Sequence, residues 1–159
     1  MKVVAAPGVP QIIISREFAA RRELLFRAYT EPELLVRWLG PEQLTITVNQ
    51  LDARHGGRWR YTHYDTDGKG YVFHGLYHGT PSLERIVQTY EFDAQPGHVY
   101  LNTITFEEHG ATTTLRQNTV FQTVEDRDGY VRSGMETGLR TSMARLDDLL
   151  GRLAAASQD

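Results

Sequence analysis

The stretch RDGYVRSGMETGLRTSMARLDDLLGRL, residues 127–153, decides the fold of this chain. Apolar side chains recur at three- and four-residue steps through its second half, which predicts an amphipathic helix. Its first half contains Gly129, Gly134 and Gly138, and each costs up to about 1 kcal/mol relative to alanine in a helix interior. We therefore expect one long C-terminal helix whose leucine-rich half anchors it and whose glycine-bearing half lies over an opening.

Six segments between residues 43 and 122 alternate apolar and polar side chains and are separated by short turns, as in an antiparallel meander. A further strand is expected at 9–18, followed by two short helices within 21–40. The pattern predicts an α+β architecture in which a curved seven-stranded antiparallel sheet, in the order β-α-α-β6-α, wraps around the long C-terminal helix. The expected domain limits are a flexible tail at 1–8, a single domain at 9–155 and a C-terminal tail at 156–159.

Two helix starts are expected from capping residues. Thr30 with Glu33 three residues later fits a capping box. Thr123 precedes two acidic residues that suit the positive end of a helix dipole, so the C-terminal helix is expected to begin there.

Composition excludes several classes of protein. The chain has 159 residues, a net charge of −3 and no cysteine, so disulfides and thiolate metal sites are excluded. A weakly acidic chain argues against nucleic-acid binding. Its apolar runs are too short for a membrane span. We expect a cytoplasmic protein without a nucleic-acid partner.

The sequence lacks a catalytic motif. His74 and His78 lie four residues apart on an expected strand, about 13 Å along it, which is too far to share one metal ion. The serines lie outside any nucleophile elbow. We expect no metal and no cofactor, and the catalytic residues, if the protein is an enzyme, stay unknown.

Aromatic side chains gather on one face of neighbouring strands, and they either fill a core or line a concave cavity between sheet and helix. Gly75 lies mid-strand, where we expect it to leave space for such a cavity. Glu136 either points into the cavity mouth or forms a surface ion pair with Arg140; His63 and Glu91 are further polar candidates. The expected ligand-binding residues are Trp38, Trp59, Tyr61, His63, Phe73, Gly75, Tyr77, Tyr90, Met135, Glu136, Leu139 and Met143.

Four stretches together resemble a known family: EFAARRELLFRAYTEPELLVRWLGP, DARHGGRWRY, FHGLYHGTPSLERIVQTYEF and VEDRDGYVRSGMETGLRTSMARLDDLL. They are similar to the START-like superfamily, in the subgroup resembling the C-terminal domain of the Hsp90 ATPase activator. The resemblance implies the helix-grip fold of that superfamily. The resemblance covers about residues 10–153. Where this family usually has two adjacent tryptophans, the chain has Trp38-Leu39, which would reshape that end of the cavity.

The resemblance implies a cavity that binds a hydrophobic, aromatic or lipid-like small molecule. Two alternatives stay open: a cyclase- or aromatase-like enzyme that uses the same cavity, and an interaction module linked to Hsp90. Only one domain of the activator would be present, which argues against direct stimulation of Hsp90. The edges of a bent sheet invite pairing, so a homodimer is a further possibility.

Overall fold

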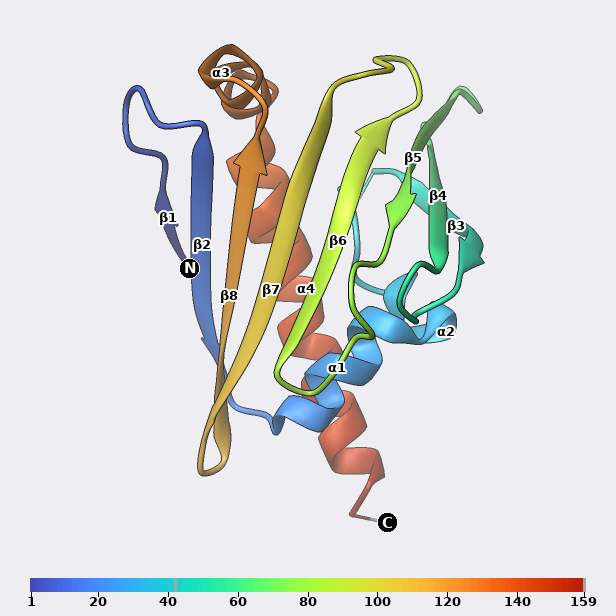
Figure 1. The fold of residues 1–159 in the computed structure, drawn as a ribbon. Coiled ribbons are helices and arrows are strands. Elements are labelled where there is room, and N and C mark those ends of the chain that lie inside the picture. The colour runs from blue at the N-terminus through green and yellow to red at the C-terminus, as the bar shows by residue number, and fades with distance from the viewer. Residues whose placement is uncertain (42, 159) are drawn as a thin grey trace.

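Eight antiparallel strands form one sheet in the computed structural model, which describes residues 1–41 and 43–158 (Figure 1). The spatial order is β1-β2-β8-β7-β6-β5-β4-β3. The strands are β1 (Lys2–Val4), β2 (Gln11–Phe18), β3 (Thr45–Leu51), β4 (Arg58–Tyr64), β5 (Gly70–Leu76), β6 (Arg85–Phe92), β7 (Val99–His109) and β8 (Thr112–Phe121). The helices are α1 (Arg22–Thr30), α2 (Pro32–Leu35), α3 (Val124–Arg132) and α4 (Met135–Ala156).

The α+β helix-grip class is confirmed, because α4 runs across one face of the single antiparallel sheet (Figure 1). The leucine-rich half of α4 anchors it, since Leu146, Leu149 and Leu150 are almost fully buried. Helix α1 contacts both α4 and β7. The core therefore lies around the C-terminal half of α4, where its apolar side chains leave water.

The expected number of strands is wrong by one, and the extra strand lies in residues 1–8, where we expected a tail. Strand β1 pairs with β2, with Val3 opposite Ile14. The side chain of Arg127 is almost fully buried, and its Nη1 donates to the carbonyl oxygen of Ala6 at 2.8 Å. This long-range hydrogen bond and the packing of Val3 against the core hold the N-terminal segment in place.

A long C-terminal helix is confirmed as α4, but its expected extent is wrong, because the segment from residue 124 onward forms two helices that meet at Gly134. This glycine has φ 85° and ψ 24°, a left-handed conformation that residues with a Cβ atom disfavour. Helix α3 ends at Arg132, and Gly134 is the N-cap residue of α4. One of the three glycines of this segment is therefore required by the backbone.

One of the two expected helix starts is confirmed. The hydroxyl of Thr123 accepts a hydrogen bond from the amide of Asp126 at 3.0 Å and caps α3. Thr30 is instead the last residue of α1, and its hydroxyl donates to the carbonyl of Phe26 at 2.7 Å. It cannot cap α2, because α1 continues through this position.

Within the two described ranges, no helix combines the length and the apolar character that crossing a bilayer requires.

Candidate functional site

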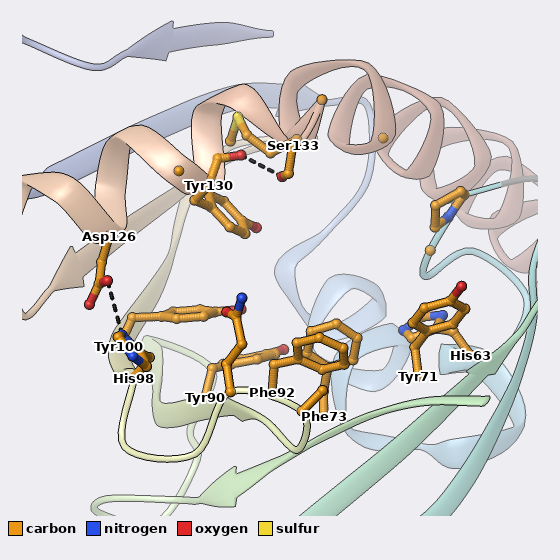
Figure 2. Close-up of a pocket in the computed structure, with 18 of the residues that line it drawn as sticks. His63, Tyr71, Phe73, Tyr90, Phe92, His98, Tyr100, Asp126, Tyr130 and Ser133 are labelled. Carbon is orange, nitrogen blue, oxygen red and sulfur yellow. Dashed lines mark hydrogen bonds and ion pairs between the residues drawn. The ribbon is translucent and has the colours of Figure 1, made fainter. Parts of the chain in front are cut away.

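A pocket of about 1210 Å³ opens between the inner face of strands β4–β8 and the junction of α3 with α4 (Figure 2). Its floor is aromatic, and its roof comes from both helices. One end is closed by the segment that follows α2. The floor and roof residues used below are Tyr61, Tyr71, Phe73, Tyr90, Phe92, Tyr100, Phe121, Tyr130, Gly134, Met135, Gly138 and Leu139.

The floor is built by strand register. Tyr90 of β6 pairs with Tyr100 of β7, which pairs with Phe121 of β8, so their side chains share one face. The rings of Tyr90 and Tyr100 stack with centroids 5.2 Å apart and an interplanar angle of 9°. Phe73 and Phe92 stack at 4.9 Å on the neighbouring strands. The floor thus presents flat aromatic faces and edges (Figure 2).

Tyr130 of α3 closes this end of the pocket. Its ring lies 5.3 Å from that of Phe121 and 5.7 Å from that of Tyr100. Figure 2 shows its hydroxyl directed from the helix into the pocket. Helix α3 therefore brings an aromatic side chain and a polar group to a wall that is otherwise formed by the sheet.

Two residues of the roof, Gly134 and Gly138, have no side chain that could fill the pocket. In the described part of the chain, no atom lies within 4 Å of a Cβ built on Gly134 or Gly138, so each position faces open space. Both glycines line the pocket. Leu139 and Met135 supply the apolar side chains beside them. The glycine-bearing segment, which was expected to lie within one long helix, thus borders the pocket.

Polar residues gather at the rim. Nδ1 of His98 lies 3.0 Å from Oδ1 of Asp126, which joins the turn before β7 to α3. Asp65, Glu125 and Arg132 complete the charged lining. Because these side chains are partly or fully exposed, the rim is polar and the interior is aromatic.

Four tyrosines of the pocket wall stay protonated at neutral pH. Burial raises the pKa of Tyr61, Tyr90, Tyr100 and Tyr130 above the usual value of tyrosine. Burial also raises the pKa of Tyr77, next to Tyr61, to about 12. Each phenol can therefore donate a hydrogen bond.

His63 is the histidine at the closed end of the pocket. Burial lowers its pKa, so the imidazole is neutral at pH 7. Its ring lies edge-on to that of Phe73 at 5.6 Å, and its Nδ1 is buried without a hydrogen-bond partner among the described residues. A Cβ on Gly40 would approach Cε1 of His63 to 2.7 Å, so the ring packs directly against the Gly40 backbone. A neutral imidazole near phenols can accept a proton, which is the chemistry an acid–base role would need.

The structure brings half of the expected ligand-binding residues to the pocket wall. Those on the wall are Tyr61, His63, Phe73, Tyr90, Met135 and Leu139. Trp38, Trp59, Tyr77 and Met143 lie instead in the core. Nε1 of Trp38 donates to the carbonyl of Ala28, and Nε1 of Trp59 donates to that of Thr89. These tryptophans satisfy their polar atoms on the backbone, as buried tryptophans usually do.

Gly75 does not leave the expected space. A Cβ at this position would lie 1.8 Å from the carbonyl oxygen of Thr89 and 2.9 Å from Nε1 of Trp59. Neighbouring atoms already fill the place of a side chain. This glycine permits the close approach of two strands, and the interpretation as a hollow is wrong.

The remaining polar candidates lie on the surface. Oε1 of Glu136 pairs with Nη2 of Arg140 at 2.8 Å, and both side chains are about half exposed. Oε2 of Glu91 accepts a hydrogen bond from the amide of Gly97 at 2.6 Å. Glu136 and Arg140 therefore form a surface ion pair at i, i+4, and Glu136 does not point into the pocket.

Sequence reasoning missed four aromatic residues of the wall: Tyr71, Tyr100, Phe121 and Tyr130. Alternation within VYLNTITF (99–106) carries a signal for Tyr100, because Asn102, Ile104 and Phe106 on the same face are buried. Tyr130 carries no such signal, since its position follows from the break at Gly134. Among the residues that the structure describes, no group of three or more His, Asp or Glu side chains is arranged to hold a metal ion.

The chain is similar to a known protein family and to several solved structures. The family model described as "Activator of Hsp90 ATPase homolog 1-like protein" matches residues 19–151. Among solved structures, a protein from Rhodobacter sphaeroides is 25% identical, covers 96% of this chain and 99% of its own, and has a TM-score of 0.86. A protein from Chromobacterium violaceum is 26% identical, with coverages of 89% and 96% and a TM-score of 0.79. A protein from Arthrobacter aurescens is 20% identical, with coverages of 95% and 91% and a TM-score of 0.86, and shows the fold alone. None of the curated proteins matches the chain.

Proposed function

The chain belongs to the family of activator of Hsp90 ATPase homolog 1-like proteins, and on this premise we propose that it binds a hydrophobic small molecule in the pocket between sheet and helices. The observation that carries the proposal is the stacked aromatic floor of Tyr90, Tyr100, Phe73 and Phe92 beneath a roof without side chains at Gly138. Ligand sites are mostly apolar hollows with a few placed polar groups, and this pocket has that composition.

The size of the pocket supports a ligand of the dimensions of a polycyclic aromatic or a lipid. A volume of about 1210 Å³ lies slightly above the range of about 300–1,000 Å³ that is typical for small-molecule sites. The pocket is partly open to solvent, so a ligand can enter it from outside. Its partly buried aromatic surface would leave water when a ligand binds, which favours association.

The position of the mouth also supports this function. It lies beside the left-handed junction at Gly134, between α3 and the turn that carries His98. Few side chains of the roof need to move for a ligand to reach the floor, because Gly134 and Gly138 contribute none.

A fluorescence titration with N-phenyl-1-naphthylamine tests the proposal. The wild-type chain should show saturable binding of the dye. Gly138→Leu places a branched side chain in the open space of the roof and should weaken binding by about tenfold or more, since it occupies ligand volume. Leucine is also a better helix former than glycine, so this variant should stay folded.

Gly151→Leu is the matched control. Gly151 lies in the same helix, outside the pocket wall, and in the described part of the chain its Cβ position is equally open. This variant should bind the dye like the wild type. Absence of saturable binding to the wild type, or equal binding by both leucine variants, would refute the proposed function.

A further inference from the structure

The polar groups inside the pocket are mainly phenol hydroxyls, and they come from separate elements. Tyr90 lies on β6, Tyr100 on β7 and Tyr130 on α3, and all three line the pocket. Figure 2 shows the hydroxyl of Tyr130 pointing from α3 toward the floor, in which the rings of Tyr90 and Tyr100 lie. The chain has thus placed three hydrogen-bonding groups at one end of an apolar hollow.

Each of these hydroxyls keeps its proton at neutral pH, because its pKa is raised, and can donate a hydrogen bond. Burial and the charges of neighbouring phenols raise the pKa of Tyr100 and of Tyr90, so each hydroxyl keeps its proton. When two phenols bond to each other, one O–H is used and the other stays free. Tyr100 and Tyr130 are such neighbours, with ring centroids 5.7 Å apart.

The charges of the wall disfavour an anionic guest. The charged residues of the lining are Asp65, Glu125, Asp126 and Arg132, and all lie at the partly exposed rim. Three carboxylates face one guanidinium, so the potential at the mouth is negative. A carboxylate at the aromatic end would lose its hydration without meeting a described cation, which is costly.

We propose that the pocket prefers an uncharged aromatic carbonyl compound, whose flat ring lies on the aromatic floor and whose carbonyl oxygen accepts a hydrogen bond from Tyr100 or Tyr130. This inference rests on the proposed ligand-binding function and specifies the ligand of the same site. A hydrocarbon would bind by ring contacts alone, and a fatty acid or aromatic acid would meet the unfavourable charge.

Three naphthalenes of similar shape test this preference by competition with N-phenyl-1-naphthylamine. 2-Acetylnaphthalene and 2-isopropenylnaphthalene have nearly the same shape, but only the ketone carries an acceptor oxygen. The ketone should bind about three- to tenfold more tightly, as expected for one net hydrogen bond. 2-Naphthoate should bind more weakly than the ketone.

Tyrosine-to-phenylalanine variants test whether the hydroxyls of Tyr100 and Tyr130 cause the preference for the ketone. The double variant Tyr100→Phe with Tyr130→Phe should bind the ketone and the alkene equally, with the affinity for the alkene unchanged. Tyr64→Phe is the control, since Tyr64 lies on β4 outside the pocket wall and is 37% exposed. That variant should keep the full preference. If the double variant does not fold, each single variant should show a reduced preference.

The possible results separate this inference from the proposed function. Equal binding of the ketone and the alkene by the wild type, a preference that survives the double variant, or tightest binding of 2-naphthoate would each overturn the inference while leaving a hydrophobic binding site. Failure of all three naphthalenes and of the dye to bind would overturn both.

Discussion

A Cβ atom on Gly75 would lie 1.8 Å from the carbonyl oxygen of Thr89, so β5 and β6 approach too closely here to admit any side chain. Gly75→Ala should force the strands apart and disturb Trp59, whose Nε1 donates to the same carbonyl. We expect a loss of about 2 kcal/mol or more in the free energy of unfolding, measured by urea denaturation. Gly151→Ala, at an open helical position, should instead stabilise by up to about 1 kcal/mol. A Gly75→Ala variant as stable as the wild type would contradict this account of the glycine.

Gly134 tests the backbone requirement at the junction of α3 and α4. In the described chain a Cβ here would meet open space, so Gly134→Ala should lose stability only through the left-handed backbone, by about 1–2 kcal/mol. Gly134→Asn should lose less, because asparagine tolerates this conformation better. Chemical denaturation of both variants provides the measurement. Equal stability of alanine and glycine here would mean that the helices join without the left-handed residue.

The buried imidazole of His63 should make the free energy of unfolding depend on pH. Burial lowers its pKa in the folded state, so the unfolded chain binds the proton more readily. The contribution of neutral His63 to stability is fully present above the ordinary pKa of about 6.5 and is lost as the pH falls through the lower folded-state pKa.

His63→Gln should reduce this loss, because glutamine stays neutral throughout. The free energy of unfolding of both proteins, measured at about pH 7.5 and about pH 5, gives the comparison. The wild type should lose more stability on acidification than the variant. The same loss in both proteins would exclude His63 as its source.

Ser142 joins α4 to the segment after α2. Its hydroxyl accepts from the amide of Gly40 at 3.1 Å and donates to the carbonyl of the same residue at 3.2 Å. Ser142→Ala should destabilise the protein by about 1–3 kcal/mol, because both backbone groups lose this partner. Nη1 of Arg145 also donates to the Gly40 carbonyl, at 3.0 Å. Because each donor still satisfies this carbonyl when the other is removed, the double variant Ser142→Ala with Arg145→Ala should lose more stability than the sum of the two single losses, which a double-mutant cycle measures.

Local patterns predicted the elements whose causes are local. Alternation of apolar residues gave the strands, and Thr123 marked the start of α3 because a cap acts within three residues. The break at Gly134 was missed, since glycine occurs both within helices and between them. Strand β1 was missed because it is only three residues long, and because the Arg127 side chain that bonds to Ala6 lies far away in the sequence.

The same distinction holds for the candidate site. Alternation along β4 placed Tyr61 and His63 on one face, where the pocket lies. It could not separate them from Trp59, which shares that face but is buried against Thr89 and Tyr90. Whether an inward residue meets a pocket or the core depends on what covers it, and periodicity does not contain that information.

The most direct measurement of the central claim is the set of intermolecular nuclear Overhauser effects between bound N-phenyl-1-naphthylamine and the protein. The account predicts contacts to the methyl groups of Leu139 and to the ring of Tyr100 on the pocket wall. Leu101 and Val120 provide the contrast, because they are 40% and 39% exposed on the opposite face of the sheet. Contacts to Leu101 and Val120 without contacts to Leu139 and Tyr100 would place the dye outside the pocket and contradict the account.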